Sequence, residues 1–381
     1  MKLLHVIPGF EIRGGGGTRA CAELCESLAT LRHEVTVAHV DSSNENCFSP
    51  KGVDVKAFPP STFRHYAYSP ALREYLKREI PKVDLVHIHA TWQYPNIPTS
   101  RYCRQYHIPY VMQPHGNLHP WKMNHKALRK KLYWHIVEKS IFASAAFIHV
   151  ESEADQEDIK HYCPDAETFV SPCGVYSEKF ENRTNPGYIK KKWPVFKDKK
   201  CLLYLARVDV NKGIHLLLKA YSKLLMSNSD YNLLIVGPDY YGTTDKMKSL
   251  SIKVGIENRV IWAGMVSDQE RIWIMQDCDI YVLPSMSENF AISVLEAMFC
   301  SKPILTTTST PWKELQLHNA GIVTHPTVDG IYRGLMRMLS LDYDALNQLG
   351  LNAYLLAKLK YEWSTIAKSL VGEYESVIKS K

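Results

Sequence analysis

Short apolar runs alternate with amphipathic stretches through the first half of the chain. Runs typical of buried strands occupy residues 2–7, 34–40, 85–88, 110–113 and 147–150, and residues 16–31 have the apolar spacing of a helix. Strands that are apolar on both faces and alternate with helices are typical of a parallel sheet covered on both sides. The pattern therefore predicts an α/β unit of the Rossmann type.

A second series of the same kind follows a polar break. Residues 176–200 are basic and contain two prolines, which favours a surface linker. Apolar runs then return at residues 201–206, 232–236, 260–263, 280–283 and 303–306, each followed by a helical stretch. We therefore predict two α/β units in tandem that face each other across a cleft, with ligands at the carboxyl ends of the strands.

Length and composition are those of a soluble globular protein. The chain has 381 residues, 45% of them hydrophobic and 22% charged, which leaves room for two or three domains. Its longest apolar runs, such as residues 141–150, are too short to span a bilayer. The first ten residues have no small-residue cleavage site and are expected to form a buried strand, not a signal peptide. Nine scattered cysteines without a C-x-x-C pair favour reduced thiols and a cytoplasmic location.

The net charge of +7 fits an anionic ligand or an anionic membrane surface. No sequence motif of a nucleic-acid-binding module is present, so nucleic acid is not an expected partner. One basic cluster lies on a probable helix that also carries Leu128 and Leu132, and consists of Lys126, Arg129, Lys130 and Lys131. Two interpretations stay open: a solvated helix face, and an amphipathic surface that contacts anionic lipid.

Four glycines, residues 14–17, separate the first strand from the first helix. They let the backbone approach a ligand closely, and the helix start behind them offers N–H groups to a phosphate or a sugar hydroxyl. Gly16 and Gly17 are therefore candidate binding residues. A flexible turn without a binding role is the alternative.

A histidine, His115, follows the strand that ends at Gln113 and precedes Gly116. At the carboxyl end of a strand it is placed to bind a sugar hydroxyl or to assist a leaving phosphate. The alternative is a structural histidine. His87 and His89 are weaker candidates, because both lie within a strand pattern and fit packing inside the sheet.

Arg207 closes the first strand of the second series, and Lys212 lies where the next helix begins. Two fixed cations at the carboxyl edge of a sheet suit a diphosphate, since arginine binds phosphate through a planar fork and lysine adds a point charge. A pair of solvated surface charges is the alternative.

Two glutamates lie in the turn and the helix that follow the strand at residues 280–283. Glu288 lies in the turn, where it can meet a sugar ring, and Glu296 lies on the helix, where its two oxygens can accept both ribose hydroxyls. On spacing alone, an amphipathic helix with surface acids is the favoured alternative. Asp277 and Asp279 resemble a D-x-D metal site but lie where a strand begins, the wrong edge for a ligand.

Taken in order, these motifs resemble family 4 of the retaining GT-B glycosyltransferases (glycosyltransferases group 1), over nearly the whole chain. The segments GGGGTRACAELCESLATLRHEVTV, PHG, ARVDVNKGI and SENFAISVLEAM carry the resemblance, together with TPWKEL and the terminal YEWSTIAKSLVGEYESVI. It implies a last helix that crosses back onto the N-terminal domain. The expected domains are then residues 1–175 with 361–381 on the acceptor side, and residues 176–360 on the sugar-nucleotide side.

The resemblance also implies roles for individual residues. Catalytic roles fall to His115, Glu288, Arg207 and Lys212, and the donor and nucleotide site comprises Gly16, Gly17, Arg207, Lys212, Gly237, Pro238, Met265, Val266, Asn289, Phe290, Ala291, Ile292 and Glu296. The implied reaction retains the anomeric configuration and needs neither a metal ion nor a cofactor. Where the family often has glycine, Ala291 adds a methyl group that is expected to shift sugar preference.

Donor and acceptor are less well defined by the resemblance. UDP-glucose is the first expectation and GDP-mannose the second, with a glycan or lipid-linked acceptor in polysaccharide biosynthesis. Two other functions stay open: a sugar-nucleotide epimerase or hydrolase on the same scaffold, and a non-catalytic scaffold protein that binds nucleotide sugars. A Rossmann oxidoreductase is disfavoured because G-x-G-x-x-G is absent.

Overall fold

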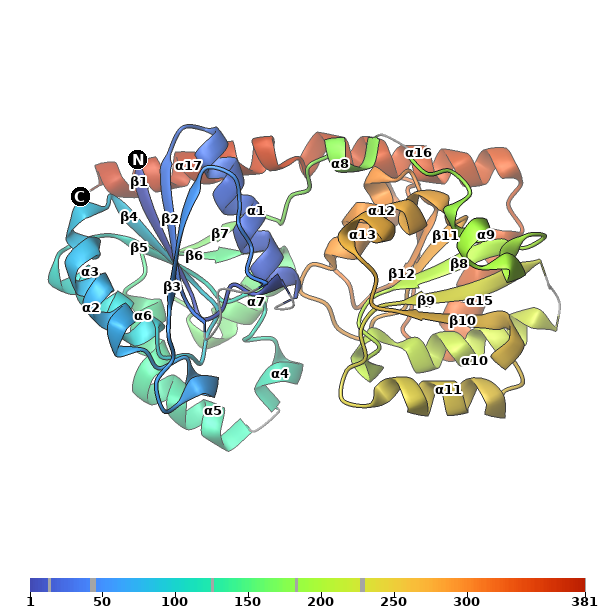
Figure 1. Ribbon diagram of the computed structural model, residues 1–381, viewed down its shortest axis with the longest axis horizontal. Coiled ribbons are helices and arrows are strands. Elements are labelled where there is room, and N and C mark those ends of the chain that lie inside the picture. The colour runs from blue at the N-terminus through green and yellow to red at the C-terminus, as the bar shows by residue number, and fades with distance from the viewer. Residues whose placement is uncertain (13–14, 42–45, 125–126, 182–183, 227–229, 381) are drawn as a thin grey trace. The chain divides into compact units, whose positions relative to one another are not determined.

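The computed structural model describes residues 1–381 except 13–14, 42–45, 125–126, 182–183, 227–229 and 381. The chain divides into two compact units (Figure 1): unit 1 comprises Met1–Gly174 with Trp363–Lys381, and unit 2 comprises Val175–Glu362. The limits expected from the sequence, at residues 175 and 361, differ from these by no more than two residues.

Unit 1 is built on a seven-stranded sheet in the order β3-β2-β1-β4-β5-β6-β7, and every paired strand runs parallel to its neighbour. Its strands are β1 (Lys2–Ile7), β2 (Glu34–Val40), β3 (Val53–Phe58), β4 (Leu85–His89), β5 (Tyr110–Gln113), β6 (Phe147–Val150) and β7 (Thr168–Val170). The central strands are buried on both faces, as the apolar runs predict, whereas edge strand β3 alternates between exposed and half-buried residues.

Helices cover both faces of this sheet (Figure 1). They are α1 (Gly16–Thr30), η2 (Arg64–Tyr66), α2 (Pro70–Glu79), η3 (Ile80–Lys82), α3 (Asn96–Gln105), α4 (Pro120–Asn124), α5 (Ala127–Tyr133), the π-helical turn η4 (Trp134–Glu138), α6 (Lys139–Ala143), α7 (Glu153–Tyr162) and α17 (Trp363–Lys379). The last of these packs along α1, where Trp363 Nε1 donates to Glu23 Oε2 at 3.0 Å. The prediction that the C-terminal helix returns to the N-terminal domain is confirmed.

Unit 2 repeats the plan with a six-stranded parallel sheet in the order β10-β9-β8-β11-β12-β13. Its strands are β8 (Lys200–Leu205), β9 (Tyr231–Val236), β10 (Val260–Gly264), β11 (Ile280–Leu283), β12 (Ile304–Thr307) and β13 (Ile322–Thr324). Its helices are α8 (Glu178–Glu181), α9 (Tyr188–Lys192), η5 (Pro194–Phe196), η6 (Val210–Lys212), α10 (Ile214–Leu225), α11 (Thr243–Lys253), η7 (Glu257–Arg259), α12 (Asp268–Asp277), α13 (Ile292–Phe299), α14 (Glu314–Leu317), α15 (Val328–Leu339) and α16 (Tyr343–Lys360). The predicted α/β class with two parallel sheets is confirmed.

The prediction of a surface linker at residues 176–200 is wrong. The described part of this segment folds onto unit 2 through α8, α9 and η5, and Phe180, Ile189 and Phe196 are buried. These three apolar residues are spaced irregularly among charges, so the segment has no periodic pattern that would reveal its packing.

The two sheets share one topological feature. In unit 1 the first strand, β1, pairs with β2 on one side and β4 on the other; in unit 2 the first strand, β8, pairs with β9 and β11. The strand order therefore reverses beside β1 and beside β8. Ligands of open α/β sheets bind at the carboxyl ends of strands next to such a reversal.

Candidate active site

Three loops meet closely at the reversal in unit 2. Gly213 has a φ of 70°, and a Cβ there would overlap the carbonyl of Pro284 in the loop after β11. Gly237 has a φ of 143°, and a Cβ there would overlap the carbonyl of Ala206 after β8. Glycine is required at both positions by conformation and by space. The loops after β8, β9 and β11 are thereby held against one another.

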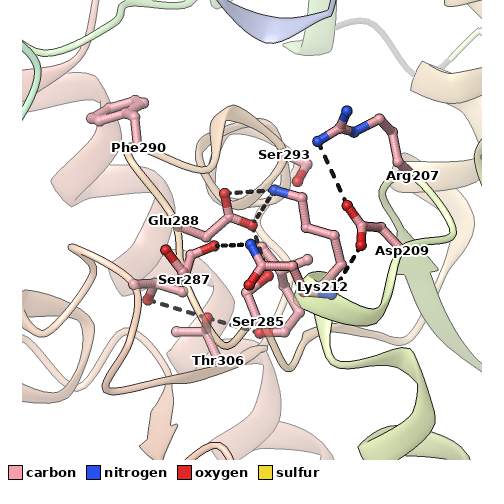
Figure 2. A network of polar contacts seen from close by, with 12 residues as sticks. Arg207, Asp209, Lys212, Ser285, Ser287, Glu288, Phe290, Ser293 and Thr306 are labelled. Atoms are coloured by element: carbon pink, nitrogen blue, oxygen red, sulfur yellow. Dashed lines mark hydrogen bonds and ion pairs between the residues drawn. The ribbon is translucent and has the colours of Figure 1, made fainter. Parts of the chain in front are cut away.

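A buried ion pair joins two of these loops (Figure 2). Lys212 Nζ donates to Glu288 Oε1 at 2.6 Å and to Oε2 at 2.7 Å, and the two side chains are only 18% and 7% exposed. Ser285 Oγ donates to Glu288 Oε1 at 2.7 Å. The sequence motifs predict separate roles for these residues, with Lys212 at a phosphate and Glu288 at a sugar. The structure brings them together as one charge-balanced group.

Arg207 lies beside this pair and is more exposed. Its guanidinium lies over the Tyr240 ring, 4.3 Å from the centroid. Figure 2 shows its ion pair with Asp209, in which Nη2 lies 3.8 Å from Oδ2. Asp209 itself caps η6 by accepting from the Asn211 backbone N–H at 3.0 Å. Stacking on an aromatic ring orients an arginine without using its N–H donors. Arg207 is thus positioned at the carboxyl end of β8 with donors available for an anion.

The second predicted glutamate, Glu296, is buried on α13 and forms an ion pair with Arg271 of α12. Sequence analysis missed Arg271, because it lies on another helix and no local pattern links it to Glu296. A carboxylate fixed by an arginine keeps lone pairs for further donors. The pairing is compatible with a hydroxyl-binding role and adds a residue that orients Glu296.

The start of α13 carries the remaining candidates of this segment. Ala291 has a φ of 63°, in the left-handed region, and no side chain caps this described helix end. Ser293 accepts a hydrogen bond from the buried Tyr281 hydroxyl at 2.7 Å, and Phe290 is packed on Trp312 with ring centroids 5.0 Å apart. Asn289 and Ile292 flank the bend and are half-buried. Uncapped N–H groups at a helix start are suited to bind an anion.

The predicted base-flanking residues lie at the ends of β9 and β10. The Gly237 N–H donates to the Gly264 carbonyl at 2.8 Å, which joins the two loops. Pro238 and Met265 are exposed and Val266 is half-buried. The structure therefore places these candidates at one edge of the sheet with Arg207.

His115, in unit 1, has both ring nitrogens engaged. Nδ1 lies 2.8 Å from Glu151 Oε1, and Nε2 lies 3.1 Å from His89 Nδ1. A Cβ at Gly17 would lie 3.3 Å from His115 Cγ, so the ring packs directly on the glycine loop. Gly16, the first residue of α1, is exposed. The structure thus joins two predicted motifs, and it identifies Glu151, which the sequence did not.

The basic cluster on α5 divides into two parts. Arg129 and Lys131 are exposed, while Lys130 Nζ donates to the Lys122 carbonyl and lies 5.7 Å from the Trp92 ring centroid. Lys126 lies outside the described residues. Of the three described members of the cluster, two are therefore exposed and one is held against unit 1.

Groups with metal-ligand chemistry also occur, and their contacts are structural. Asp277 accepts from the Gly187 and Ile189 N–H groups, each at 2.9 Å, and Asp279 accepts from Cys201 N–H at 2.7 Å. These bonds give both acids of the D-x-D segment a role in holding α9 and β8. His5, His87 and His89 form a three-histidine group with nitrogens within 4.8 Å of one another, but His5 and His89 already share a hydrogen bond.

Comparison with known proteins decides the family. A family model described as glycosyltransferase family 4 matches residues 14–179, and one described as glycosyl transferases group 1 matches residues 188–355. The crystal structure of HepE from Anabaena in complex with UDP and glucose superposes with a TM-score of 0.79 over 99% of this chain and 100% of that one, at 18% identity. This chain belongs to the GT-B glycosyltransferases.

Relatives of this GT-B glycosyltransferase carry similar names. An uncharacterized glycosyltransferase of Methanocaldococcus jannaschii is 26% identical over 98% of both chains. A phosphatidyl-myo-inositol mannosyltransferase of Mycobacterium leprae is 28% identical over 48% of both chains. Within the described residues of the GT-B glycosyltransferase, no helix has both the length and the apolar character needed to cross a bilayer.

Proposed function

We propose that this GT-B glycosyltransferase moves a hexose from a sugar nucleotide to a glycan or lipid-linked acceptor, with retention of anomeric configuration and without a metal ion. The observation that supports this proposal is the cluster of Arg207, Lys212 and Glu288 at the carboxyl ends of β8 and β11. Arg207 and Lys212 supply the positive charge that a diphosphate leaving group requires. Unit 2 is therefore the proposed donor unit, and unit 1 the acceptor unit.

In the proposed reaction the bond between the anomeric carbon and the β-phosphate oxygen breaks, and the acceptor oxygen forms the new bond on the same face. The acceptor hydroxyl proton passes to the leaving diphosphate. Two of the three Lys212 N–H donors can serve the Glu288 carboxylate, so the third can bind a phosphate oxygen. Glu288 then faces the sugar hydroxyls, and the start of α13 meets the phosphate.

Glu296 is proposed to accept the two ribose hydroxyls, with Arg271 fixing its orientation. Gly237, Pro238, Met265 and Val266 are proposed to flank the base. HepE was crystallised with UDP and glucose, which supports UDP-glucose as the first donor to test. Mannosyltransferases among the relatives support GDP-mannose as the second.

A ligand panel in the presence of a chelator tests the donor site. Thermal unfolding is measured with UDP, GDP, ADP and their common sugar conjugates, and we expect stabilisation by one nucleotide family only. At one hundred times its dissociation constant, a ligand adds about 2.7 kcal/mol. Glu296→Ala should reduce this shift, whereas Glu257→Ala, at an exposed position of η7, should not. No shift with any nucleotide would contradict the donor site and favour a scaffold protein.

Product analysis separates transfer from the other chemistries of the same scaffold. With donor and an acceptor extract, a transferase forms a glycoside whose anomeric configuration matches the donor. Free sugar or an epimerised sugar nucleotide as the sole product would identify a hydrolase or an epimerase instead.

We also propose that unit 1 contacts an anionic membrane on its cytoplasmic side through the outward face of α5 and η4. Leu128, Leu132 and Ile136 recur every four residues and are 86%, 63% and 69% exposed. Arg129 and Lys131 lie beside this apolar ridge and are exposed as well. Apolar side chains between basic ones are typical of helices that lie in a membrane interface. Each basic residue near such a surface contributes about 1 kcal/mol.

Co-sedimentation with vesicles tests the membrane contact. We expect binding to phosphatidylglycerol vesicles, weak binding to phosphatidylcholine vesicles, and loss of both in a Leu128→Gln/Leu132→Gln/Ile136→Gln variant. A wild-type dimer in sedimentation velocity that this variant disrupts, with no vesicle binding, would show that a second copy of the chain covers the ridge.

A further inference from the structure

A run of hydrogen-bonded imidazoles crosses the interior of unit 1 and ends on a carboxylate. His5 Nδ1 lies 2.9 Å from His89 Nε2, and His89 Nδ1 lies 3.1 Å from His115 Nε2. His115 Nδ1 lies 2.8 Å from Glu151 Oε1. His5, His89 and Glu151 are almost fully buried, so bulk water competes little for these contacts.

The number of protons that each group carries determines which nitrogen donates in each hydrogen bond of the run. An ionised Glu151 can only accept, so His115 carries its proton on Nδ1. A neutral His115 then has a lone pair on Nε2, which accepts from His89 Nδ1–H, and His89 Nε2 in turn accepts from His5 Nδ1–H. The run ends at His5 Nε2, a lone pair without a hydrogen-bond partner among the described residues. With neutral imidazoles and an ionised carboxylate, this single arrangement of protons satisfies all three bonds.

The titration behaviour of the buried members agrees with that arrangement. Burial lowers the pKa of His5 to about 3, and burial together with the neighbouring histidines holds the pKa of His89 well below its usual range. Burial opposes ionisation of Glu151, but the hydrogen bond from His115, together with the Cys173 and His149 contacts of the carboxylate, outweighs burial, so the pKa of this carboxyl lies below its ordinary value. Two neutral rings and one carboxylate are therefore expected at neutral pH.

Among the groups that face the run from other elements, Lys122 donates to the His115 carbonyl at 3.5 Å and Asp155 accepts from the Glu151 N–H at 3.3 Å, so both contact its backbone. His87 lies on His89 with ring centroids 4.3 Å apart, and burial keeps the pKa values of His87 and His149 low. Burial raises the pKa values of the Cys25 and Cys173 thiols and of the Tyr374 hydroxyl. Among the side chains bonded in series along the run, Glu151 is thus the charged one.

We propose that Glu151, His89 and His5 are positioning residues that fix His115 as a neutral imidazole protonated on Nδ1. The inference rests on the proposed function for one consequence only. Because Nδ1 is bonded to Glu151, Nε2 is the ring nitrogen whose lone pair can accept a hydrogen bond, and His89 fills it in this structure. A neutral His115 held in this way keeps its single N–H on Glu151, so it is not a proton donor to the leaving group.

Nitrogen-15 NMR of the intact protein tests the proton arrangement without any assay of activity. Long-range correlations within the imidazole ring report which nitrogen carries the proton, and His115→Gln and His89→Gln difference spectra assign the signals. At neutral pH we expect both His115 and His89 to carry the proton on Nδ1, the less common tautomer of free histidine. A proton on His115 Nε2, or a doubly protonated ring, would overturn the proposal. Either NMR result stands even where the protein proves not to be a transferase.

Two variants of the middle residue separate positioning from packing. His89→Gln keeps an N–H donor for His115 Nε2, whereas His89→Phe fills the space without one. We expect His89→Phe to lower kcat about tenfold, the effect of one hydrogen bond, with the donor KM unchanged, and His89→Gln to retain most of the wild-type kcat. Equal losses in both variants, or a loss carried by KM alone, would contradict a positioning role.

Discussion

The two units share one sheet plan and use opposite polar chemistry at their strand-order reversals. In unit 2 the residues at the reversal are charged: Lys212 pairs with Glu288, and Arg207 lies exposed beside them. In unit 1 they are imidazoles linked in series to one carboxylate, with His89 at the centre. Fixed charges suit a ligand whose own charge grows during reaction. A run of neutral donors and acceptors instead fixes which atom donates and which accepts each hydrogen bond, and the recognition of a hydroxyl group depends on that.

The two units should also differ in how much stability they lose when a polar residue is removed. Removing one member of a buried ion pair leaves its partner charged and without compensation, which costs several kcal/mol. Removing one neutral ring costs a hydrogen bond and some packing. Unit 2 should therefore respond more to the loss of a charge, and unit 1 more to a change in proton concentration.

The largest expected effect is that of Lys212→Met. It removes the phosphate contact and leaves the Glu288 carboxylate buried beside Ser285. We expect kcat/KM to fall by a factor of about one hundred to one thousand, and the unfolding temperature of unit 2 to fall. Steady-state kinetics and calorimetry measure both quantities.

The matched control is Lys219→Met, on the exposed face of α10. It removes the same charge without a buried partner, and both quantities should stay close to wild type. Similar kinetics for the two variants would show that Lys212 serves only to balance Glu288. The double variant Lys212→Met/Glu288→Gln should recover stability without recovering activity.

A second contrast concerns acid. Burial lowers the pKa values of six imidazoles in unit 1: His5, His33, His39, His87, His89 and His149. The folded state of each prefers the neutral ring, so its stabilising contribution is complete above the unfolded pKa of 6.5 and is lost as pH falls toward about 4 for His149 and about 3 for His5. Two buried carboxyls, Glu138 and Asp155, act in the opposite sense because their pKa values are raised to about 7.

The six imidazoles outnumber the carboxyls of unit 1 whose pKa values burial raises, which are Glu138, Asp155 and the half-buried Asp158. Unit 1 should therefore lose several kcal/mol of stability between pH 6.5 and pH 4. Hydrogen exchange measured by mass spectrometry follows the two units separately. We expect peptides from β1, β4 and β6 to lose protection first as the pH falls. Earlier loss in β8 and β11 would reverse the comparison between the units.

Local sequence patterns predicted the strands of the protein better than the contacts between its site residues. The apolar runs marked β1, β2, β5, β6 and β11 because each strand is buried along its length. Edge strand β3 was missed because it is only half-buried. Lys212 and Glu288 were found as separate motifs, but their pairing depends on two loops that only the sheet order brings together.

The residues that escaped prediction lack a local signature. Arg271 is an ordinary charged residue in the α12 sequence, and its contact with Glu296 arises from the packing of two helices. His5 and His149 lie inside apolar strands, where the sequence pattern does not distinguish a histidine from the other core residues. A long-range hydrogen-bond network leaves no periodic trace, so the sequence marked His115 without Glu151, the residue that fixes it.

A smaller effect is expected where the imidazole run meets the glycine loop. Gly17→Ala places a methyl group 3.3 Å from His115 Cγ, so the ring must shift by a few tenths of an ångström. We expect kcat to fall several-fold, and strain to cancel the helix-propensity gain of about 1 kcal/mol. Gly372→Ala on α17, with nothing within 4 Å, should instead stabilise unit 1 by about that amount. Equal stabilisation by both changes would show that the His115 ring is free to move.

The smallest expected effect concerns Ala291 in unit 2. Its φ of 63° costs an alanine about 1 kcal/mol relative to a right-handed conformation, a cost that glycine does not bear. Ala291→Gly should therefore stabilise unit 2 by a few tenths of a kcal/mol, after the added backbone entropy of the unfolded chain is subtracted. Ala154→Gly, at an exposed position of α7 in unit 1, should destabilise by about 1 kcal/mol, since there the alanine is helical.

Differential scanning calorimetry of both variants measures these opposite signs. If Ala291→Gly stabilises the protein and lowers the activity, the strained bend is part of how the start of α13 meets its ligand. If it stabilises the protein and leaves activity unchanged, the methyl group acts on neither phosphate nor sugar, and the expected shift in sugar preference from Ala291 is wrong. Destabilisation would mean that the methyl contributes packing that outweighs the left-handed strain, and the two units would then differ less than their polar chemistry suggests.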